Sequence, residues 1–340
     1  MESKFPLKRF LGIQGMKPAL AAFAVLIVIY TTFGIIDQTV FSSVNIMNLL
    51  RSMSIFLLVG IGQSFVLITG NIDLSIGSIV GMSAIISSEL MYRPGMSPLY
   101  AFLITIVCCL FIGLINGTLV GRVKFPPHIA TLCMMFIARG VAYLLSRGYG
   151  NPHISWGIGK EAAERLQNFF YYGKTWGIHN TFLIAIAIFA VSFFLLSGTK
   201  TGRHMYAVGS NIDAAKLSGV NVQATITKAY LVSSFCACVV GLILCAQSGM
   251  GNMEAGVMYE MYGVAAAVTG GISTFGGTGI LLGTLAGSAV WQTLQNGLSM
   301  VGAQVGIQRI VIGVAVMIVV LLDIVLRRGK RAKIDKPQTE

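Results

Sequence analysis

A short polar stretch between two apolar segments is the part of the sequence best suited to chemistry. It runs Thr69-Gly70-Asn71-Ile72-Asp73-Leu74-Ser75. A carboxylate at bilayer depth costs about 2.5–3.5 kcal/mol or more, so Asp73 needs a structural or functional reason. One interpretation is a turn between two helices, with Asp73 as the N-cap of the second helix. The other is a broken helix that lines a transport path, because irregular backbone is tolerated beside a cavity.

The other polar groups inside apolar segments are mostly neutral amides and hydroxyls, which suit a path for a neutral, polyhydroxylated solute. A proton-coupled carrier would need a buried series of carboxylates and histidines, and ionisable groups are too sparse for one. The alternative role for such residues is hydrogen bonding between helices. Arg139 lies deep in a predicted span, and Asp73 is its candidate partner. The candidates for lining a pathway are Asn71, Asp73, Ser75, Asn116 and Thr131.

The sequence carries no recognisable catalytic or metal-binding pattern. Gly173-Lys174-Thr175 ends like a phosphate-binding loop, but Asn168 stands where the first glycine is required. The four histidines are far apart and offer no metal-ligand spacing. We therefore predict no enzyme, no metal and no cofactor bound by this chain, so any energy from ATP must come from another polypeptide.

Composition identifies an all-α integral membrane protein. The 340 residues are 55% hydrophobic and only 11% charged, which is too apolar for a water-soluble domain. The apolar runs are continuous and do not alternate with polar residues, so helices are favoured over a barrel. Basic residues cluster at the ends of these runs, which marks topology and argues against nucleic-acid binding. The predicted spans are 18–36, 46–69, 74–92, 98–120, 126–146, 178–197, 227–249, 257–275, 278–299 and 304–326.

The distribution of lysine and arginine predicts the topology. The N-terminal segment 1–17 and the tail 327–340 are both basic, so both are predicted to be cytoplasmic. Two inside termini require an even number of crossings. With ten crossings, sixteen basic residues fall on the inside and five on the outside. Residues 18–326 are thus predicted to form one transmembrane domain.

Two connections between spans are unusually long. Residues 147–177, predicted on the outside, include the aromatics Trp156, Phe169, Phe170, Tyr171, Tyr172 and Trp176, which favour an interfacial helix; a docking surface for an extracytoplasmic partner is the alternative. Residues 198–226 lie on the inside. There Asn211 or Asp213 could cap a short helix that Gly219 ends. A helix on the cytoplasmic face is what a membrane domain needs to contact a soluble motor.

A weak internal similarity suggests two related halves. Residues 66–72 resemble residues 266–272, and Asn116-Gly117 recurs as Asn296-Gly297. Such repeats, here spans 2–5 and 7–10, are common in transporters. Chance similarity between glycine-rich apolar segments is the alternative.

Four motifs resemble those of the ribose-type ABC transporter permeases. Residues 69–78 are similar to the signature G-G-I-D-L-S-V-G-S, and residues 124–132 to K-x-P-P-F-I-A-T-L. Residues 202–220 resemble the loop G-R-x-x-Y-A-x-G-x-N-x-x-A-A-x-x-S-G-I/V, and residues 259–271 resemble Y-E-L-D-A-I-A-A-V-x-x-G-G. The resemblance extends from about residue 45 to 326, in the same order and with the same spacing.

The resemblance implies a permease subunit of an importer for simple sugars or polyols in the bacterial cytoplasmic (inner) membrane. It implies the ten-span permease fold with a cytoplasmic coupling helix between spans six and seven. The implied partners are a cytoplasmic ATPase that uses ATP and Mg, an extracytoplasmic sugar-binding protein, and a second permease in a homo- or heterodimer. The residues that it places in the coupling loop are Arg203, Tyr206, Asn211, Ala214, Ala215 and Gly219.

Three departures from the family pattern leave the substrate open. Asn71 replaces the second glycine of the signature, and His128 replaces a phenylalanine. Met261-Tyr262-Gly263 stands where Leu-Asp-Ala is usual, so an acidic group is lost. The alternatives are a related ABC permease for branched-chain amino acids or nucleosides, and a stand-alone secondary carrier.

Overall fold

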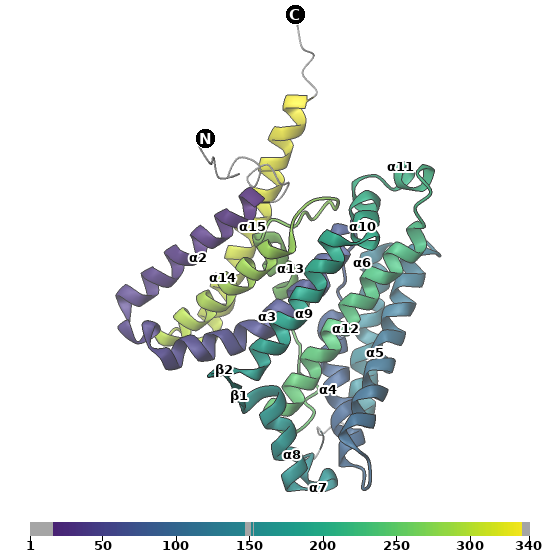
Figure 1. The fold of residues 1–340 in the computed structure, drawn as a ribbon. Helices are drawn as coiled ribbons and strands as arrows, with labels where there is room; N and C mark the ends of the chain where they lie inside the picture. Colours follow the sequence, from purple (N-terminus) through teal and green to yellow (C-terminus); the bar gives the residue numbers. More distant parts are fainter. Residues whose placement is uncertain (1–15, 147–150, 152, 335–340) are drawn as a thin grey trace, which may run out of the picture.

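A computed structural model describes residues 16–146, 151 and 153–334 as a bundle of helices (Figure 1). The predicted N-terminal segment and the end of the basic tail lie almost entirely outside these residues. The long elements are α2 (Met16–Ile36), α3 (Ser43–Ile68), α4 (Ile76–Tyr92), α5 (Pro98–Gly121), α6 (Pro127–Leu145), α9 (Asn180–Gly198), α12 (Val222–Ser248), α13 (Tyr259–Thr269), α14 (Leu281–Met300) and α15 (Val305–Ile334). The short ones are η1 (Gln38–Phe41), α7 (Ser155–Ile158), α8 (Lys160–Gln167), η2 (Asn168–Tyr172), α10 (Lys200–Ser210) and α11 (Ile212–Leu217).

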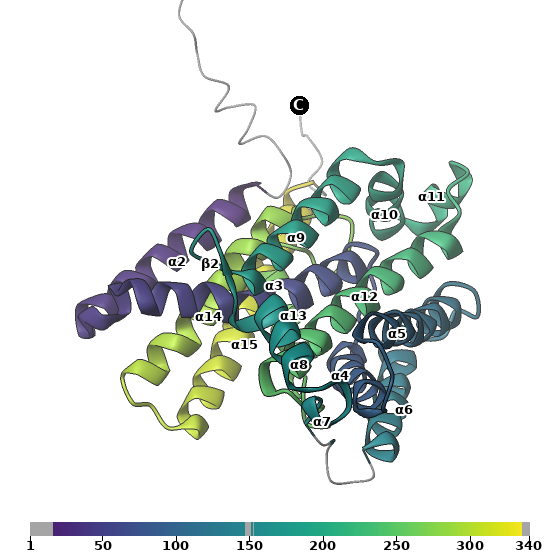
Figure 2. The same ribbon diagram turned by 60° about the horizontal axis from the view of Figure 1, so that its bottom comes forward.

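The helices confirm an all-α, multi-pass membrane protein. Within the described residues, α2, α3, α5, α6, α9 and α12 are long and apolar enough to cross a membrane. The most apolar stretch of α12 is 78% buried, whereas that of α2 is 17% buried. Helix α12 is therefore central and α2 peripheral. Both views place α12 between α5 and α6 on one side and α2, α14 and α15 on the other (Figures 1 and 2).

Helix α13 is shorter than the span predicted at 257–275. Its 11 residues rise about 16 Å, roughly half of a hydrocarbon core of about 30 Å. Irregular backbone precedes it at 249–258 and follows it at 270–280. Helix α4 likewise begins only after the irregular stretch 69–75. The break after α13 meets the stretch 69–75, because Gly276 packs against Gly70, and the break before α13 packs through Gly256 on Gly77 in the first turn of α4.

The described residues 153–179 fold into several small elements at one end of the bundle. These are α7, α8, the single π-turn η2, and a two-residue hairpin in which β1 (Lys174–Thr175) pairs antiparallel with β2 (Ile178–His179). Trp156 and Trp176 are exposed, whereas Tyr171 is buried beneath the Arg51 guanidinium, which lies 4.6 Å from its ring centroid. The aromatics thus divide between surface and packing. We call this the α8 end; α10 and α11 lie at the opposite, α11 end (Figure 1).

Candidate functional site

The polar stretch 69–75 is a turn around the buried carboxylate of Asp73. Asp73 Oδ1 accepts the Ser75 backbone N–H at 2.9 Å and the Ser75 hydroxyl at 2.6 Å. Asp73 Oδ2 accepts the Ser233 hydroxyl of α12 at 2.7 Å. The Tyr230 hydroxyl, one turn away on α12, donates to the Ile72 carbonyl at 3.0 Å. The turn is therefore attached to the central helix by two side chains.

Two predictions about Asp73 are wrong. It is not the N-cap of α4: Ser75 holds that position and makes no side-chain capping bond. A carboxylate that accepts the backbone N–H two residues later instead forms an Asx turn, which leads into the helix. Nor is Asp73 the partner of Arg139, whose Nη1 donates to the carbonyls of Met253 and Ala255. The sequence gives no long-range signal that would have selected these partners.

The structure brings three of the five pathway candidates together. The Asn116 amide of α5 donates to the Ser75 hydroxyl at 2.9 Å, so Asp73, Ser75 and Asn116 form one buried network with Ser233. The other two candidates bond locally. Thr131 Oγ1 donates to the Pro127 carbonyl at 2.8 Å in its own helix, and the half-buried amide of Asn71 donates to Thr69. Their role in a pathway stays a prediction.

Ser233 is the functional candidate that sequence reasoning missed. It lies in a long apolar run and carries no motif. A signal was present, however, because Ser233-Ser234 places two hydroxyls in the middle of an otherwise apolar span. Polar residues at such positions commonly form hydrogen bonds between helices.

The helix predicted in the inside connection is present as α11. Asn211 is its N-cap and accepts the Ala214 backbone N–H at 2.9 Å, which decides between the two caps considered. Gly219 follows the helix in the left-handed region, with φ of 78°. Ala215 is buried, while Arg203, Asn211, Ala214 and Gly219 are exposed.

Helix α11 also carries exposed apolar side chains. Leu217 is 91% exposed and Ile212 is 51% exposed, although both are apolar and sit on a helix of six residues. Sequence reasoning did not select either residue, because a short helix gives too little periodicity to identify its free face. Such residues at the tip of a protruding element are suited to insertion into a partner protein.

Helix α10 joins α11 to the membrane domain through a tight backbone junction. The α10 junction consists of Ile68 at the end of α3, Gly209 of α10, and Gly277 in the loop after α13. Gly277 donates its N–H to the Ile68 carbonyl at 2.9 Å. Gly209 packs so closely that any Cβ there would overlap the Ile68 carbonyl oxygen and press on the Gly277 nitrogen. Helix α10 is therefore in direct backbone contact with α3 and with the loop after α13.

Tyr206 of α10 forms a hydrogen bond with the loop between α13 and α14. Its hydroxyl donates to the Gly279 carbonyl at 2.8 Å. Burial raises the pKa of the Tyr206 phenol to about 12, so the donor stays protonated at any physiological pH. Among the coupling candidates, Tyr206 is thus the residue that makes a direct, pH-insensitive contact with a membrane segment.

Comparison with known proteins gives consistent matches along almost the whole chain. Residues 45–321 match a family described as the permease component of a branched-chain amino acid transport system. The chain is 33% identical to the ribose import permease of Bacillus subtilis, over 92% of this chain and 93% of that protein. It is 32% identical to the ribose import permease of Haemophilus influenzae, over 94% and 96%. It is 31% identical to the fructose import permease of Rhizobium meliloti, over 92% and 86%. No solved structure gives a significant match.

Proposed function

Because the chain belongs to the family of ribose-type transport-system permeases, and is therefore a transport component and not an enzyme, we propose that it imports a simple sugar or polyol. The observation that carries this proposal is similarity over more than nine-tenths of the chain to ribose import permeases. Relatives named for fructose, galactose and D-allose import support the same substrate class. The branched-chain amino acid in the family description makes an amino acid the competing substrate.

The proposed topology has ten crossings in a bacterial inner membrane, with both termini and the α11 end in the cytoplasm. The excess of basic residues on that side supports it. In this arrangement α13 and its flanking loops make the eighth crossing as a broken helix. Helices α3 and α12, with 26 and 27 residues, each precede an irregular break and a shorter helix. This parallel supports two related halves.

The proposed mechanism is alternating access driven by a separate ATPase. ATP and Mg belong to that subunit, which contacts the exposed face of α11. A sugar-binding protein docks at the α8 end, and a second permease, identical or not, completes the pathway. A ligand shifts a conformational equilibrium only through different affinities for the two states. The α10 junction is the element that would transmit the ATPase state, since it joins α10 to α3 and to the loop after α13.

Replacing Gly219 by valine tests the coupling role of α11. The residue has φ of 78° and nothing within 4 Å of its position for a Cβ, so the variant strains the turn without a clash. We expect transport by the assembled complex to fall about tenfold, the equivalent of 1.4 kcal/mol of strain. Membrane insertion should be unchanged, and ATP hydrolysis should persist. Normal coupled transport by Gly219→Val would reject the assignment of this loop.

Uptake assays test the substrate class. A strain lacking this chain should lose uptake of at least one of ribose, fructose, galactose and allose, and should regain it with the wild-type gene. Leucine and nucleoside uptake should stay at the parental level. Loss of leucine or nucleoside uptake with sugars unaffected would overturn the proposal. Purified alone in liposomes, the chain should not move sugar down an ion gradient, which separates it from a secondary carrier.

A further inference from the structure

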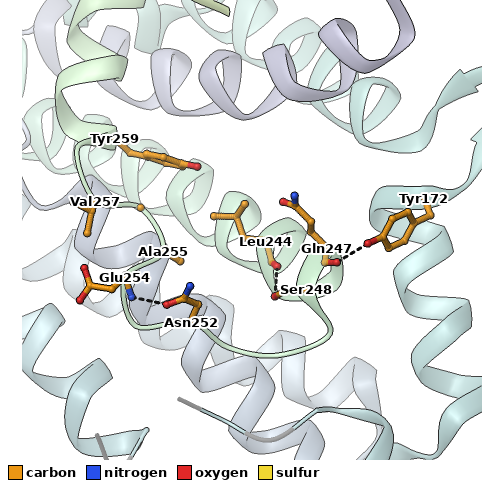
Figure 3. A pocket seen from close by; sticks show the side chains of 10 residues that line it. Tyr172, Leu244, Gln247, Ser248, Asn252, Glu254, Ala255, Val257 and Tyr259 are labelled. Atoms are coloured by element: carbon orange, nitrogen blue, oxygen red, sulfur yellow. Dashed lines mark hydrogen bonds between the residues drawn. The ribbon is translucent and has the colours of Figure 1, made fainter. Parts of the chain in front are cut away.

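A cavity with both polar and apolar lining opens at the α8 end of the central helix. It has a volume of about 430 Å³ and lies between the last turn of α12, the loop 249–258 and η2 (Figure 3). Small-molecule sites in proteins have volumes of about 300–1,000 Å³. The cavity is thus large enough for a monosaccharide, and none of the Asp73 network residues lines it.

Neutral hydrogen-bonding groups line this cavity. Gln247 and Asn252 contribute amides, and Tyr172 and Tyr259 contribute phenols. Figure 3 shows the Gln247 amide and the hydroxyl end of Tyr259 directed toward the same space. A phenol offers an apolar ring face together with a polar tip. The combination matches a sugar, which has C–H faces and a rim of hydroxyls.

The one carboxylate among the lining residues is turned away from the centre of the cavity. Glu254 points away from Gln247 and Tyr172 in Figure 3, and its Oε1 accepts the Tyr143 hydroxyl of α6 at 2.5 Å. No lysine, arginine or histidine is present among the described residues that line the cavity. The nearby Arg139 Nη1 is bonded to the carbonyls of Met253 and Ala255.

This charge distribution favours a neutral sugar or polyol over an amino acid, the competing substrate. An amino acid carries a carboxylate, which needs a cationic or multiple N–H partner when it leaves water. Sugar phosphates have the same requirement. A neutral polyol needs only mixed donors and acceptors, and amides and phenols supply both.

We propose that this cavity is a receiving site for a neutral, polyhydroxylated solute entering from the α8 end. The inference rests on the proposed function and assigns it a site and a substrate class. Gly256, which lines the cavity, also packs against Gly77 in the first turn of α4. The loop 249–258 therefore lines the proposed site and packs on the segment that follows the Asp73 turn, so it connects the two.

Saturation-transfer NMR on the full-length permease in detergent micelles measures this weak binding directly. D-ribose, D-fructose, D-galactose and D-allose are the probes, with L-leucine as the charged comparison. Wild type should transfer saturation to at least one sugar and none to leucine. Gln247→Leu and Asn252→Leu should each weaken that sugar's signal about three- to tenfold, because each variant removes one hydrogen bond to the sugar. Gln167→Leu is the matched control. Gln167 of α8 is half-buried like Gln247, but it does not line the cavity.

The outcomes separate this inference from the proposed function. Sugar uptake that depends on the chain, with NMR signals unchanged in both cavity variants, overturns the receiving site and leaves the import function intact. A leucine signal that both cavity variants abolish overturns the neutral-solute assignment. Size-exclusion chromatography checks that each variant is folded. A loss seen in only one monodisperse variant still supports the site, because the two side chains come from different segments.

Discussion

Replacing Gly209 by alanine is expected to reduce sugar transport by the assembled importer to below about a tenth of the wild-type rate, because overpacking costs about 1–3 kcal/mol and the neighbour here is backbone. The new Cβ would overlap the Ile68 carbonyl oxygen and would displace the Gly277 N–H that bonds to it. Helix α10 would then have to move away from α3. ATP hydrolysis by the partner subunits should continue, since the exposed face of α11 is untouched. Proteoliposomes that contain the full complex allow both rates to be measured on one sample.

Gly140→Ala is the control for this experiment. Gly140 is also inside a helix, but nothing lies within 4 Å of the position where its Cβ would be. Alanine there should preserve transport, because it raises helix propensity by about 1 kcal/mol without a clash. If Gly209→Ala transports sugar at the rate of Gly140→Ala, the α10 junction does not carry the coupling. If Gly209→Ala loses ATP hydrolysis as well, the junction acts in assembly and not in transmission.

The sequence predicted the helices well because hydropathy reports local composition. The predicted spans 18–36 and 178–197 agree with α2 and α9 within two residues. The break around α13 was harder to predict, because the apolar residues continue through Gly270-Gly271 while the backbone does not stay helical. Hydropathy averaged over a window detects apolar content but not the continuity of hydrogen bonds. Charge counting predicted a crossing at this position, and the helix covers only part of it.

In the candidate site, too, the sequence predicted contacts between residues close in the chain and missed contacts between distant ones. Capping of α11 by Asn211 was predictable, because the Asn211 side chain accepts from the Ala214 N–H only three residues later. The Asp73–Ser233 bond joins residues 160 apart, and the Asn116–Ser75 bond joins residues 41 apart. One sequence contains no pairing information at such separations. The cavity at the α8 end was unpredictable for the same reason, since η2 meets the end of α12 and the loop that follows it only in the fold.

Replacing Asp73 by leucine is expected to have the largest effect on stability. The change leaves the Ser75 N–H, the Ser75 hydroxyl and the Ser233 hydroxyl without their acceptor in a buried site. Each donor left unsatisfied costs about 1–3 kcal/mol. We expect most of this variant to be absent from the membrane fraction, and the remainder to unfold at a markedly lower temperature in detergent.

Asp73→Asn then separates a structural role from a direct role in transport. The amide oxygen of asparagine can still accept both bonds from Ser75, and its NH₂ group can donate to the Ser233 oxygen, so the turn keeps three partners. If Asp73 only organises the turn, this variant should fold, assemble with the ATPase and transport sugar at nearly the wild-type rate. Intact assembly with transport lost would instead require the negative charge itself, which places Asp73 on the pathway in another conformation. Ser233→Ala removes one bond and keeps that charge, so it should transport sugar under either interpretation.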